Sequence, residues 1–542
     1  MTRSDPRADL ATHEVQNQPG ERGDVDLWQT DAPLREAVAR EGGQAGALAD
    51  YGGVLGAAAM REAARDANRF TPELRLFDSG GRRLDEVRYH PSYHRFMETS
   101  LGAGYAAVAW ERLPGGHVTH AAMVYLASQV EPGHCCPMTM TYAAVPALSA
   151  SDDLAGKWRP KLLSRQYDPS LRPVAEKSGA TLGMAMTEKQ GGSDVRTNTT
   201  RAVADGEAWR LTGHKWFCSA PMSDGFLTLA QAPAGLTCFL VPRWLEGERN
   251  RVQIMRLKDK LGNCSNASAE IEFDRALAYG IGGEGQGVRT IIEMVHHTRL
   301  DTAMAPAGLM RAALGEAHHW AAHRTAFQRR LIDQPLMRAV LADLALDWEG
   351  ALALGLRVAR AFDGQGPEDR AFARIGVALA KYLSNRRCPI VVFEAMEVMG
   401  GMGYVEDTPM PMLYREAPLN GIWEGAGNVI CLDILRTLAR EPLAAEVLLV
   451  EIRSAVGADR RFDAAVKDHL SRWPVLPPEA EARWFAERSA LLLTASILLR
   501  HAPPAVAEAF VATRIAGEGG RTTGAIGKHD VTAILARLAD RD

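Results

Sequence analysis

The sequence has few cysteines, and they form no pattern that would build a stabilising framework. Its 542 residues contain seven Cys, an odd number, and no Cys-x-x-Cys pair occurs. A disulfide-stapled secreted fold and a zinc site are therefore disfavoured, and a reducing cytoplasm is expected. The first two dozen residues lack the apolar segment of a secretory signal, and runs such as "LLLTASILL" are far too short to span a bilayer. We therefore expect a soluble, intracellular, bacterial protein.

The sequence also lacks a strong excess of charge of either sign. The formal net charge is −4 and the isoelectric point is about 6.5, with 46% hydrophobic and 24% charged residues. That balance is ordinary for a globular protein and gives no sign of nucleic-acid or membrane binding. The chain is too long for one hydrophobic core, so several domains are expected.

The periodicity of apolar residues changes three times along the chain and predicts five segments. Residues 1–30 are polar and predict an extended arm. Spacings of three to four predict a helical N-terminal domain over 31–179, and alternation predicts a β domain over 180–286. Helical patterns return over 287–440, as a bundle, and over 441–542, as an extra C-terminal helical domain. The predicted class is α+β.

The β segment carries clear hairpin and strand signals. "TTRAVADGEAWRLTG" predicts two strands around Asp205–Gly206, and "FLTLAQAPAGLTCFLVP" predicts a second hairpin. "ASAEIEF" alternates apolar and polar residues, as in a half-buried strand. We predict an antiparallel β-barrel. "GIGGEG" (Gly280–Gly285) matches the glycine pattern of a dinucleotide-binding fold, but only helices follow it, so no parallel sheet can form around it. We therefore predict that this segment is a hinge between the barrel and the bundle.

Five motifs occur in an order and spacing that resemble one family. They are "MTEKQGGSD", "GHKWFCSAP", "HRTAFQRRLIDQPLMRAVLADLAL", "EAMEVMGGMGYVED" and "LYREAPLNGIWEGAGNVI". Together they resemble the acyl-CoA dehydrogenase family of flavoproteins, clearly over 180–440 and by architecture before that. The resemblance implies the family fold, a helical domain, a central barrel and a helical bundle. It also implies FAD as cofactor.

The resemblance assigns one group of residues to the flavin ring and its neighbourhood. Thr187 would reach the isoalloxazine, Gly192 would let the backbone approach, and Ser193 would donate to the pyrophosphate. Phe217 takes the aromatic position on the strand and Ser219 the hydroxyl position. Further residues expected against the cofactor are Met184, Met186, Cys218, Ile422, Trp423, Gly425 and Asn428.

A second group would hold the other end of the cofactor. Arg324 and Gln334 match residues that grip the pyrophosphate and adenosine, often across a subunit boundary. A guanidinium suits this role because it is always charged and binds phosphate through two bonds. Gly400 and Gly401 match a loop that receives the adenine part of a neighbour's cofactor. These assignments favour a homotetramer, as a dimer of dimers, although a dimer stays open.

Glu424 of "IWEGAGN" falls on the family's catalytic base. The reaction needs a carboxylate over the substrate α-carbon while the β-hydrogen leaves as hydride. Because the α-proton is weakly acidic, the site must raise the pKa of the base by desolvation and acidify the substrate. The other reading of Glu424 is a negative charge that favours the start of a helix.

Departures from the family pattern point to a particular branch. Lys189 stands for Pro, Gly191 for Ala, and Trp423 for Tyr, while Ala426 and Cys431 replace Thr and Arg. With the extra C-terminal segment, these changes resemble the AidB-like branch of the DNA alkylation response. That resemblance implies weak acyl-CoA dehydrogenase activity and binding of double-stranded DNA through the C-terminal part.

Three functions therefore stay open at this point. They are an FAD-dependent acyl-CoA dehydrogenase, a protective DNA-binding flavoprotein with little turnover, and a flavin-holding relic. Glu424 argues against a nitroalkane oxidase, for which an Asp base is expected. Residues 441–542 carry 13 Lys and Arg against 14 Asp and Glu, a net charge of −1, whereas a DNA-binding domain is usually basic.

Overall fold

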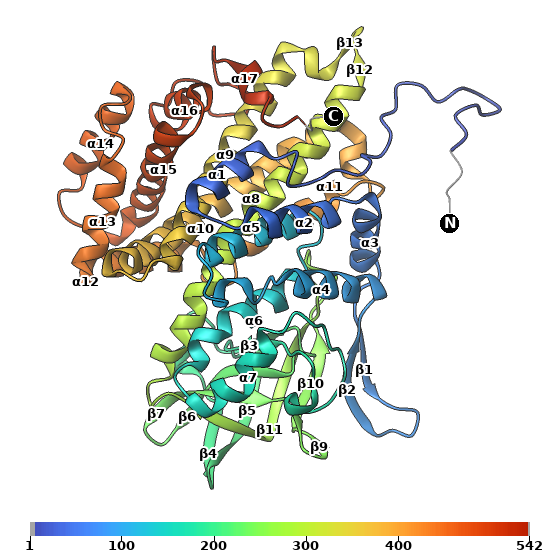
Figure 1. Cartoon of the computed structure of the whole chain (residues 1–542), viewed down its shortest axis with the longest axis vertical. Coiled ribbons are helices and arrows are strands. Elements are labelled where there is room, and N and C mark those ends of the chain that lie inside the picture. Colours follow the sequence, from blue (N-terminus) through green and yellow to red (C-terminus); the bar gives the residue numbers. More distant parts are fainter. Residues whose placement is uncertain (1–5, 540–542) are drawn as a thin grey trace.

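A computed structural model describes residues 6–539 and shows helices stacked above a β-barrel (Figure 1). Residues 6–30 form an extended arm with one isolated β-bridge, between Asp9 and Glu14, and end in a turn that buries Leu27 and Trp28. The N-terminal helices that follow are α1 (Ala32–Glu41), α2 (Ala45–Leu55), α3 (Ala58–Arg69), α4 (Pro91–Ala103), α5 (Gly116–Ser128), α6 (Cys135–Leu148) and α7 (Asp152–Leu162).

The N-terminal region also contains a hairpin that the helical prediction missed. Strands β1 (Glu73–Phe77) and β2 (Arg83–Arg88) pair antiparallel and project beside the barrel (Figure 1). The burial of β1 alternates along the strand, the pattern of a ribbon with one covered face. Gly81 has φ +77°, the left-handed conformation that closes the turn without strain. The short period-two pattern was hidden between two strongly helical segments.

The middle of the chain forms the predicted barrel. Its strands are β3 (Leu182–Ala185), β4 (Arg201–Asp205), β5 (Ala208–Ser219), β6 (Gly225–Ala232), β7 (Gly235–Pro242), β10 (Val252–Leu257) and β11 (Ser268–Ile281). A ring closes through the order β11, β5, β4, β6, β7 and back to β11, with β10 and β3 added outside it. Two pairings, β3 with β6 and β4 with β6, are parallel, so the sheet is not purely antiparallel as predicted.

Both predicted hairpins are present in the barrel. β4 pairs with β5 around Gly206, which has φ +66°, and β6 pairs with β7. The strand over "ASAEIEF" is present in β11 but is more buried than its alternation predicted. Glu270 is covered because Arg256 and Lys258 donate to its carboxylate at 2.6 and 2.7 Å. The segment Gly280–Gly285 leads from β11 to the next helix, as the hinge prediction required.

Three long helices cross the centre of the molecule above the barrel. They are α8 (Gly287–His323), α9 (Pro335–Asp363) and α10 (Pro367–Val398). α8 has 37 residues and is buried on all sides over its middle, as expected for the core of a bundle. A small hairpin, β12 (Thr325–Ala326) and β13 (Arg329–Arg330), joins α8 to α9 at the end away from the barrel (Figure 1).

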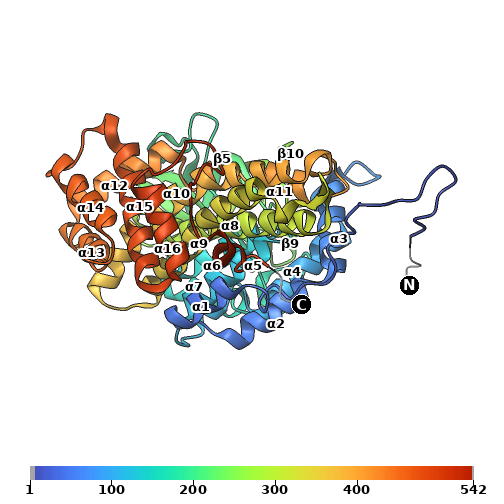
Figure 2. The same ribbon diagram turned by 90° about the horizontal axis from the view of Figure 1, so that it is seen from above.

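The last part of the chain lies against the outside of this bundle. It contains α11 (Met410–Glu416), α12 (Gly427–Arg440), α13 (Pro442–Arg453), α14 (Arg460–Arg472), α15 (Ala482–His501), α16 (Pro504–Phe510) and α17 (Val531–Leu535). Seen from above, α12 to α16 form one flank of the molecule (Figure 2). Arg514 joins this flank to α9 through Asp343 at 2.5 Å and Asp347 at 2.9 Å. Among residues 6–539, no helix is long and apolar enough to cross a bilayer.

Candidate active site

Glu424 lies in a tight turn between a short 3-10 turn, Leu419–Gly421, and the start of α12. Its φ of +58° is left-handed, which is uncommon for a residue other than glycine and recurs at functional sites. The Glu424 Oε2 atom accepts a hydrogen bond from the Thr298 hydroxyl on α8 at 2.7 Å. The Arg299 Nε atom donates to the Glu424 backbone oxygen at 3.3 Å. The turn therefore holds the carboxyl group against α8 in one orientation.

Lys381 of α10 holds the backbone of the same turn. Its buried ammonium donates to the backbone oxygens of Asn420 at 2.6 Å and Trp423 at 2.9 Å. The Trp423 indole in turn donates to the Asn420 side chain at 2.7 Å. Asp433 holds Arg299 through an ion pair of 2.6 Å. Lys381, Thr298 and Arg299 thus form a support for Glu424 that the motif alone did not reveal.

Burial shifts the pKa values of Glu424 and Lys381 in opposite directions. Desolvation raises the pKa of the Glu424 carboxyl above its ordinary value, and the Thr298 bond and the Lys381 charge oppose that rise. Desolvation likewise lowers the pKa of Lys381, while the Glu424 charge raises it. Glu424 as a whole residue is only half-buried, but its carboxyl group is enclosed by protein atoms. A carboxylate with a raised pKa, partly open to a ligand, is suited to general-base catalysis.

The loop after β3 is built around a buried ion pair. Glu188 accepts from the Lys215 ammonium at 2.8 Å and from the Thr200 hydroxyl at 2.6 Å, and all three side chains are buried. The backbone oxygen of Thr187 accepts from the Trp216 amide at 2.7 Å. A Cβ added at Gly192 would lie 2.5 Å from the Thr187 hydroxyl. Thr187 is therefore positioned by its neighbours on both sides.

The end of β5 presents two candidate cofactor residues on one face. Phe217 is 49% exposed, and the Ser219 hydroxyl lies 3.2 Å from that of Ser268. Cys218 between them is fully buried, because neighbouring side chains on a strand point to opposite faces. Cys218 therefore offers only its backbone to this face. Met184 on β3 and Met186 just after it are half-buried, whereas Ser193 in the following loop is exposed.

Cys136 at the start of α6 connects the barrel side of the site to Glu424. Burial raises the pKa of its thiol to about 11, Lys260 and a hydrogen bond with Ser219 lower it, and the Glu424 charge raises it. Its thiol is therefore close to Ser219 and within electrostatic reach of Glu424. Neither Cys136 nor Lys260 was a predicted site residue. Chemistry-bearing side chains inside apolar helical runs, such as those in "HHTRLD" and "CCPMTM", are the only sequence signal for this group.

Arg324 and Gln334 lie at the other end of the bundle. Arg324 directly follows α8, whereas Thr298 lies in the first third of that helix. At a rise of 1.5 Å per residue, the two are about 39 Å apart along the axis. Arg324 donates to the Gln18 side chain at 2.8 Å, and Gln334 donates to the Ala326 oxygen at 2.9 Å. These two residues cannot share one ligand with the Glu424 turn of the same chain.

The remaining predicted residues differ in exposure: Gly400, Gly401, Ile422 and Asn428 are exposed, whereas Trp423 and Gly425 are half-buried. Gly400, with φ +59°, and Gly401 have no atom within 4 Å of an added Cβ. Ile422 is 64% exposed, and Gly425 has φ +106°. Asn428 is exposed at the start of α12, where Arg483 donates to it at 3.3 Å.

The residues at the end of β5 and in the loop after β3 fit the ring end of a flavin. An exposed aromatic face at Phe217, the Ser219 hydroxyl and a glycine-backed Thr187 offer an apolar surface bordered by hydrogen-bonding groups, which a flavin ring requires. Together with the Glu424 carboxyl, whose pKa burial raises, these residues are compatible with the fold and cofactor of an acyl-CoA dehydrogenase.

Comparison with known families agrees with this class. Residues 17–169 match the adaptive response protein AidB N-terminal domain, 183–276 the acyl-CoA dehydrogenase middle domain, and 285–439 the acyl-CoA dehydrogenase C-terminal domain. The chain is 44% identical over 518 residues to "Putative acyl-CoA dehydrogenase AidB" of Escherichia coli (strain K12), covering 94% of this chain and 95% of that protein. The chain belongs to the acyl-CoA dehydrogenase family, in the group that includes AidB, and its cofactor is FAD.

More distant relatives share the fold. Acyl-CoA dehydrogenase family member 11 of Caenorhabditis elegans is 33% identical over 396 residues, which are 69% of this chain and 64% of that protein. The crystal structure of C. elegans ACDH-11 in complex with C11-CoA has a TM-score of 0.82 at 26% identity and covers 93% of this chain and 94% of that one. The Bd2924 apo-form has a TM-score of 0.81 at 29% identity and covers 90% and 100%.

Proposed function

We propose that this protein dehydrogenates an acyl-CoA thioester, with Glu424 as the base that removes the α-proton. The observation that carries the proposal is the Glu424 turn. Its carboxyl group has a raised pKa, a single hydrogen bond from Thr298, and a backbone held by Lys381 and Arg299. The structural relative ACDH-11 was solved with C11-CoA, which supports a thioester as ligand.

Each residue of the turn has a defined task in this reaction. Glu424 accepts the proton from the α-carbon, and its enclosure makes the carboxylate a stronger base than one in water. Thr298 orients the carboxylate through Oε2 and leaves Oε1 free for the proton. Lys381 keeps the backbone of the turn in place. FAD, when bound, supplies the acceptor for the β-hydrogen as hydride.

We propose further that each FAD is held by two chains, in a homotetramer built as a dimer of dimers. Thr187, Phe217 and Ser219 serve the ring of the chain's own cofactor. Arg324 and Gln334, about 39 Å along α8 from Thr298, serve the pyrophosphate and adenosine of a partner's cofactor. The exposed Gly400 and Gly401 loop is suited to the same task, because open backbone can approach a flat base closely.

Anaerobic titration with a panel of acyl-CoA thioesters tests the enzyme directly. We expect at least one thioester to bleach the flavin absorbance at stoichiometric amounts. Glu424→Gln keeps the shape of the side chain and should slow that reduction by about 10²–10⁴-fold, with FAD still bound. Glu293→Gln on the exposed face of α8 is the matched control. If the thioester reduced the flavin of Glu424→Gln as fast as that of the wild type, Glu424 would not be the base.

Association with double-stranded DNA is the second candidate function. Its structural support is a group of exposed cations on α13 and α14 that form no ion pair within residues 6–539: Arg453, Arg460, Lys467 and Arg472. The match to an adaptive response domain supports the same idea. This function would operate in the cytoplasm, as the sequence predicts.

The structure limits how strong that association can be. Arg461, Arg488, Arg500, Arg514 and Arg537 are held in ion pairs within the fold. Few phosphates can then be contacted per chain, so the binding constant should fall shallowly with salt, by about 0.9 log units per contact for each tenfold rise in salt concentration. Gel retardation of a labelled duplex, with Arg460→Glu/Lys467→Glu against wild type, measures this. Equal retardation by both proteins would place any DNA contact elsewhere.

A further inference from the structure

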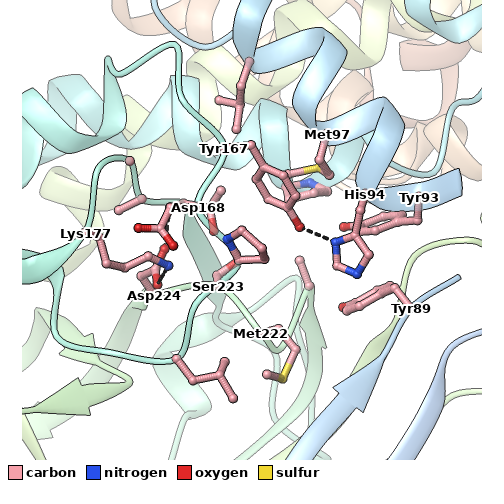
Figure 3. A pocket seen from close by; sticks show the side chains of 18 of the residues that line it. Tyr89, Tyr93, His94, Met97, Tyr167, Asp168, Lys177, Met222, Ser223 and Asp224 are labelled. Atoms are coloured by element: carbon pink, nitrogen blue, oxygen red, sulfur yellow. Dashed lines mark hydrogen bonds and ion pairs between the residues drawn. The ribbon is translucent and has the colours of Figure 1, made fainter. Parts of the chain in front are cut away.

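A cavity of about 190 Å³ lies between α4, the chain after α7 and the turn between β5 and β6 (Figure 3). Its wall contains Tyr89 and Tyr93, whose rings stack with centroids 4.3 Å apart. Met97 and Met222 add soft apolar surface on either side. The cavity is therefore mostly apolar and aromatic, with polar groups at defined places.

Two residues of the cavity wall are sequence neighbours of residues assigned to the barrel side of the Glu424 site. Pro137 and Ala220 line the cavity, and they directly follow Cys136 and Ser219. The Ser219 hydroxyl lies 3.2 Å from that of Ser268, and the Glu424 charge raises the pKa of the Cys136 thiol. This position makes the cavity a candidate for the part of a ligand that extends beyond the reacting carbons.

Several hydrogen-bonding groups of the wall have no partner within residues 6–539. The Ser223 hydroxyl is buried and forms no hydrogen bond, a state that costs free energy unless a ligand supplies the bond. The Tyr89 and Tyr93 hydroxyls also lack hydrogen bonds in this described part of the chain. His94 uses Nδ1 to bond the Tyr167 hydroxyl at 2.6 Å, and its other ring nitrogen remains available (Figure 3).

The charged groups of the wall are already satisfied. Lys177 pairs with Asp224 at 2.5 Å, and Asp224 also accepts from the Thr181 amide at 2.8 Å. Asp168 accepts from the amides of Ser170 and Ser178, both at 3.0 Å. Glu86 also lines the cavity, so three carboxylates against one ammonium leave the wall with an excess of negative charge. An anionic group in this cavity would meet repulsion and no free cation.

We propose that this cavity binds the tail of the acyl group and selects a neutral, ring-bearing tail with a hydrogen-bonding substituent. The inference rests on the proposed acyl-CoA function. Size favours one ring, because a cavity of about 150 Å³ lined by apolar side chains holds benzene. The stacked tyrosines and methionines suit a flat ring, and Ser223, Tyr93 or His94 suits a hydroxyl on it. A hydroxyphenyl-propanoyl thioester meets all of these conditions.

Equilibrium binding separates this tail from others. Calorimetry with the FAD-loaded Glu424→Gln protein, which holds thioesters without converting them, compares four CoA thioesters: 3-(4-hydroxyphenyl)propanoyl, 3-phenylpropanoyl, hexanoyl and glutaryl. We expect the hydroxyphenyl thioester to bind tightest and the anionic glutaryl thioester weakest. The hydroxyphenyl thioester should bind about 2- to 12-fold more tightly than the phenyl thioester, which is the contribution of one net hydrogen bond. Equal binding of the hydroxyphenyl and hexanoyl thioesters would overturn the inference.

Variants of the wall distinguish this inference from the general function. Ser223→Leu fills the cavity and should abolish the preference for ring-bearing tails, while butyryl-CoA still reduces the flavin in a chain that retains Glu424. Ser223→Ala should remove only the hydroxyphenyl advantage. Ser79→Leu, at the exposed turn of the β1–β2 hairpin, is the control. Ring-tail binding that survives Ser223→Leu refutes the cavity assignment alone, whereas failure of every thioester to bind refutes the proposed function with it.

Discussion

At the scale of single residues, two adjacent glycines in one loop have different structural demands. A Cβ added at Gly192 would lie 2.5 Å from the Thr187 hydroxyl and 2.9 Å from its methyl group, so Thr187 would have to move. A Cβ at Gly191 would meet only the Thr197 hydroxyl, at 3.8 Å. Neither glycine has a left-handed φ. The pair therefore separates a steric effect on Thr187 from a general effect on the loop.

Gly192→Ala should weaken FAD binding, because it displaces a residue assigned to the flavin ring. Strain of this kind in a packed site costs about 1–3 kcal/mol, and the FAD dissociation constant should rise by about 5- to 150-fold if all of it is felt by the holoprotein. Gly191→Ala should leave that constant within about twofold. Flavin fluorescence on titration of the apoprotein measures both. The same affinity for both variants would contradict the placement of Thr187.

The pH dependence of flavin reduction should report Glu424. The carboxylate must be deprotonated to act, and burial raises its pKa, so the rate should fall with decreasing pH at values above the ordinary pKa of glutamic acid. Lys381 lowers that pKa through its charge. Lys381→Met should therefore move the acidic limb of the profile to higher pH. Lys157→Met, an exposed substitution on α7, should leave the limb unchanged, and an unshifted limb in Lys381→Met would refute the coupling.

At the scale of elements, the N-terminal arm holds the hairpin that carries Arg324. The side-chain amide of Asn17 donates to the Thr325 backbone oxygen at 2.8 Å. The side-chain oxygen of Asn17 accepts from the Thr325 backbone amide at 2.7 Å. The Asn17 backbone oxygen accepts a further bond from Arg324. An arm residue thus mimics a third strand beside β12 and orients the guanidinium.

Removal of the hydrogen bonds between the Asn17 side chain and Thr325 should weaken FAD binding without changing the site near Glu424. Asn17→Gly suits the left-handed φ of +57° and deletes both amide bonds. Two neutral hydrogen bonds are worth about 1–3 kcal/mol in total, so the largest expected loss of FAD affinity is about 150-fold. Gln16→Ala is the control, because the Gln16 side chain donates a hydrogen bond to Glu14 at 3.0 Å and none to β12 or β13. Equal FAD affinity for the two variants would show that the arm does not position Arg324.

At the scale of the whole molecule, exposed apolar side chains gather where α8 turns into α9. Phe327 is 92% exposed and Leu336 is 79% exposed, on either side of β13. Large apolar side chains that cluster in solvent usually mark an interface. Arg324 lies on the same hairpin, so a subunit contact here would bring its guanidinium to a partner's cofactor.

Phe327→Asp should therefore dissociate the proposed tetramer and lower FAD affinity together. Sedimentation velocity reports the mass, and flavin fluorescence reports the cofactor. Val475→Asp is the matched control, because Val475 is 77% exposed on the opposite flank of the molecule. An unchanged mass for Phe327→Asp would place the subunit interface elsewhere, and loss of mass without loss of FAD would refute the shared cofactor site.

The sequence by itself determined the large features of this protein, because they depend on residues close together in the chain. The two barrel hairpins, the hinge at Gly280–Gly285 and the long helices follow from periodicity and turn residues read over short windows. The β1–β2 hairpin escaped because its few alternating residues lie between strong helical patterns, and the parallel partners of β6 escaped because strand pairing is not local. The resemblance of five motifs supplied the family and FAD.

Only the tertiary structure decided what surrounds each functional residue. Thr298 and Glu424 are 126 positions apart in sequence, and Lys381 reaches the same turn from another helix. The length of α8 places Arg324 about 39 Å along the helix axis from Thr298, so the two predicted groups of cofactor residues lie at opposite ends of this helix within one chain. The cavity beside Tyr93 and Ser223 lies between α4 and the barrel. Such contacts depend on how helices and barrel pack, and packing is set by the whole set of side chains rather than by any local pattern.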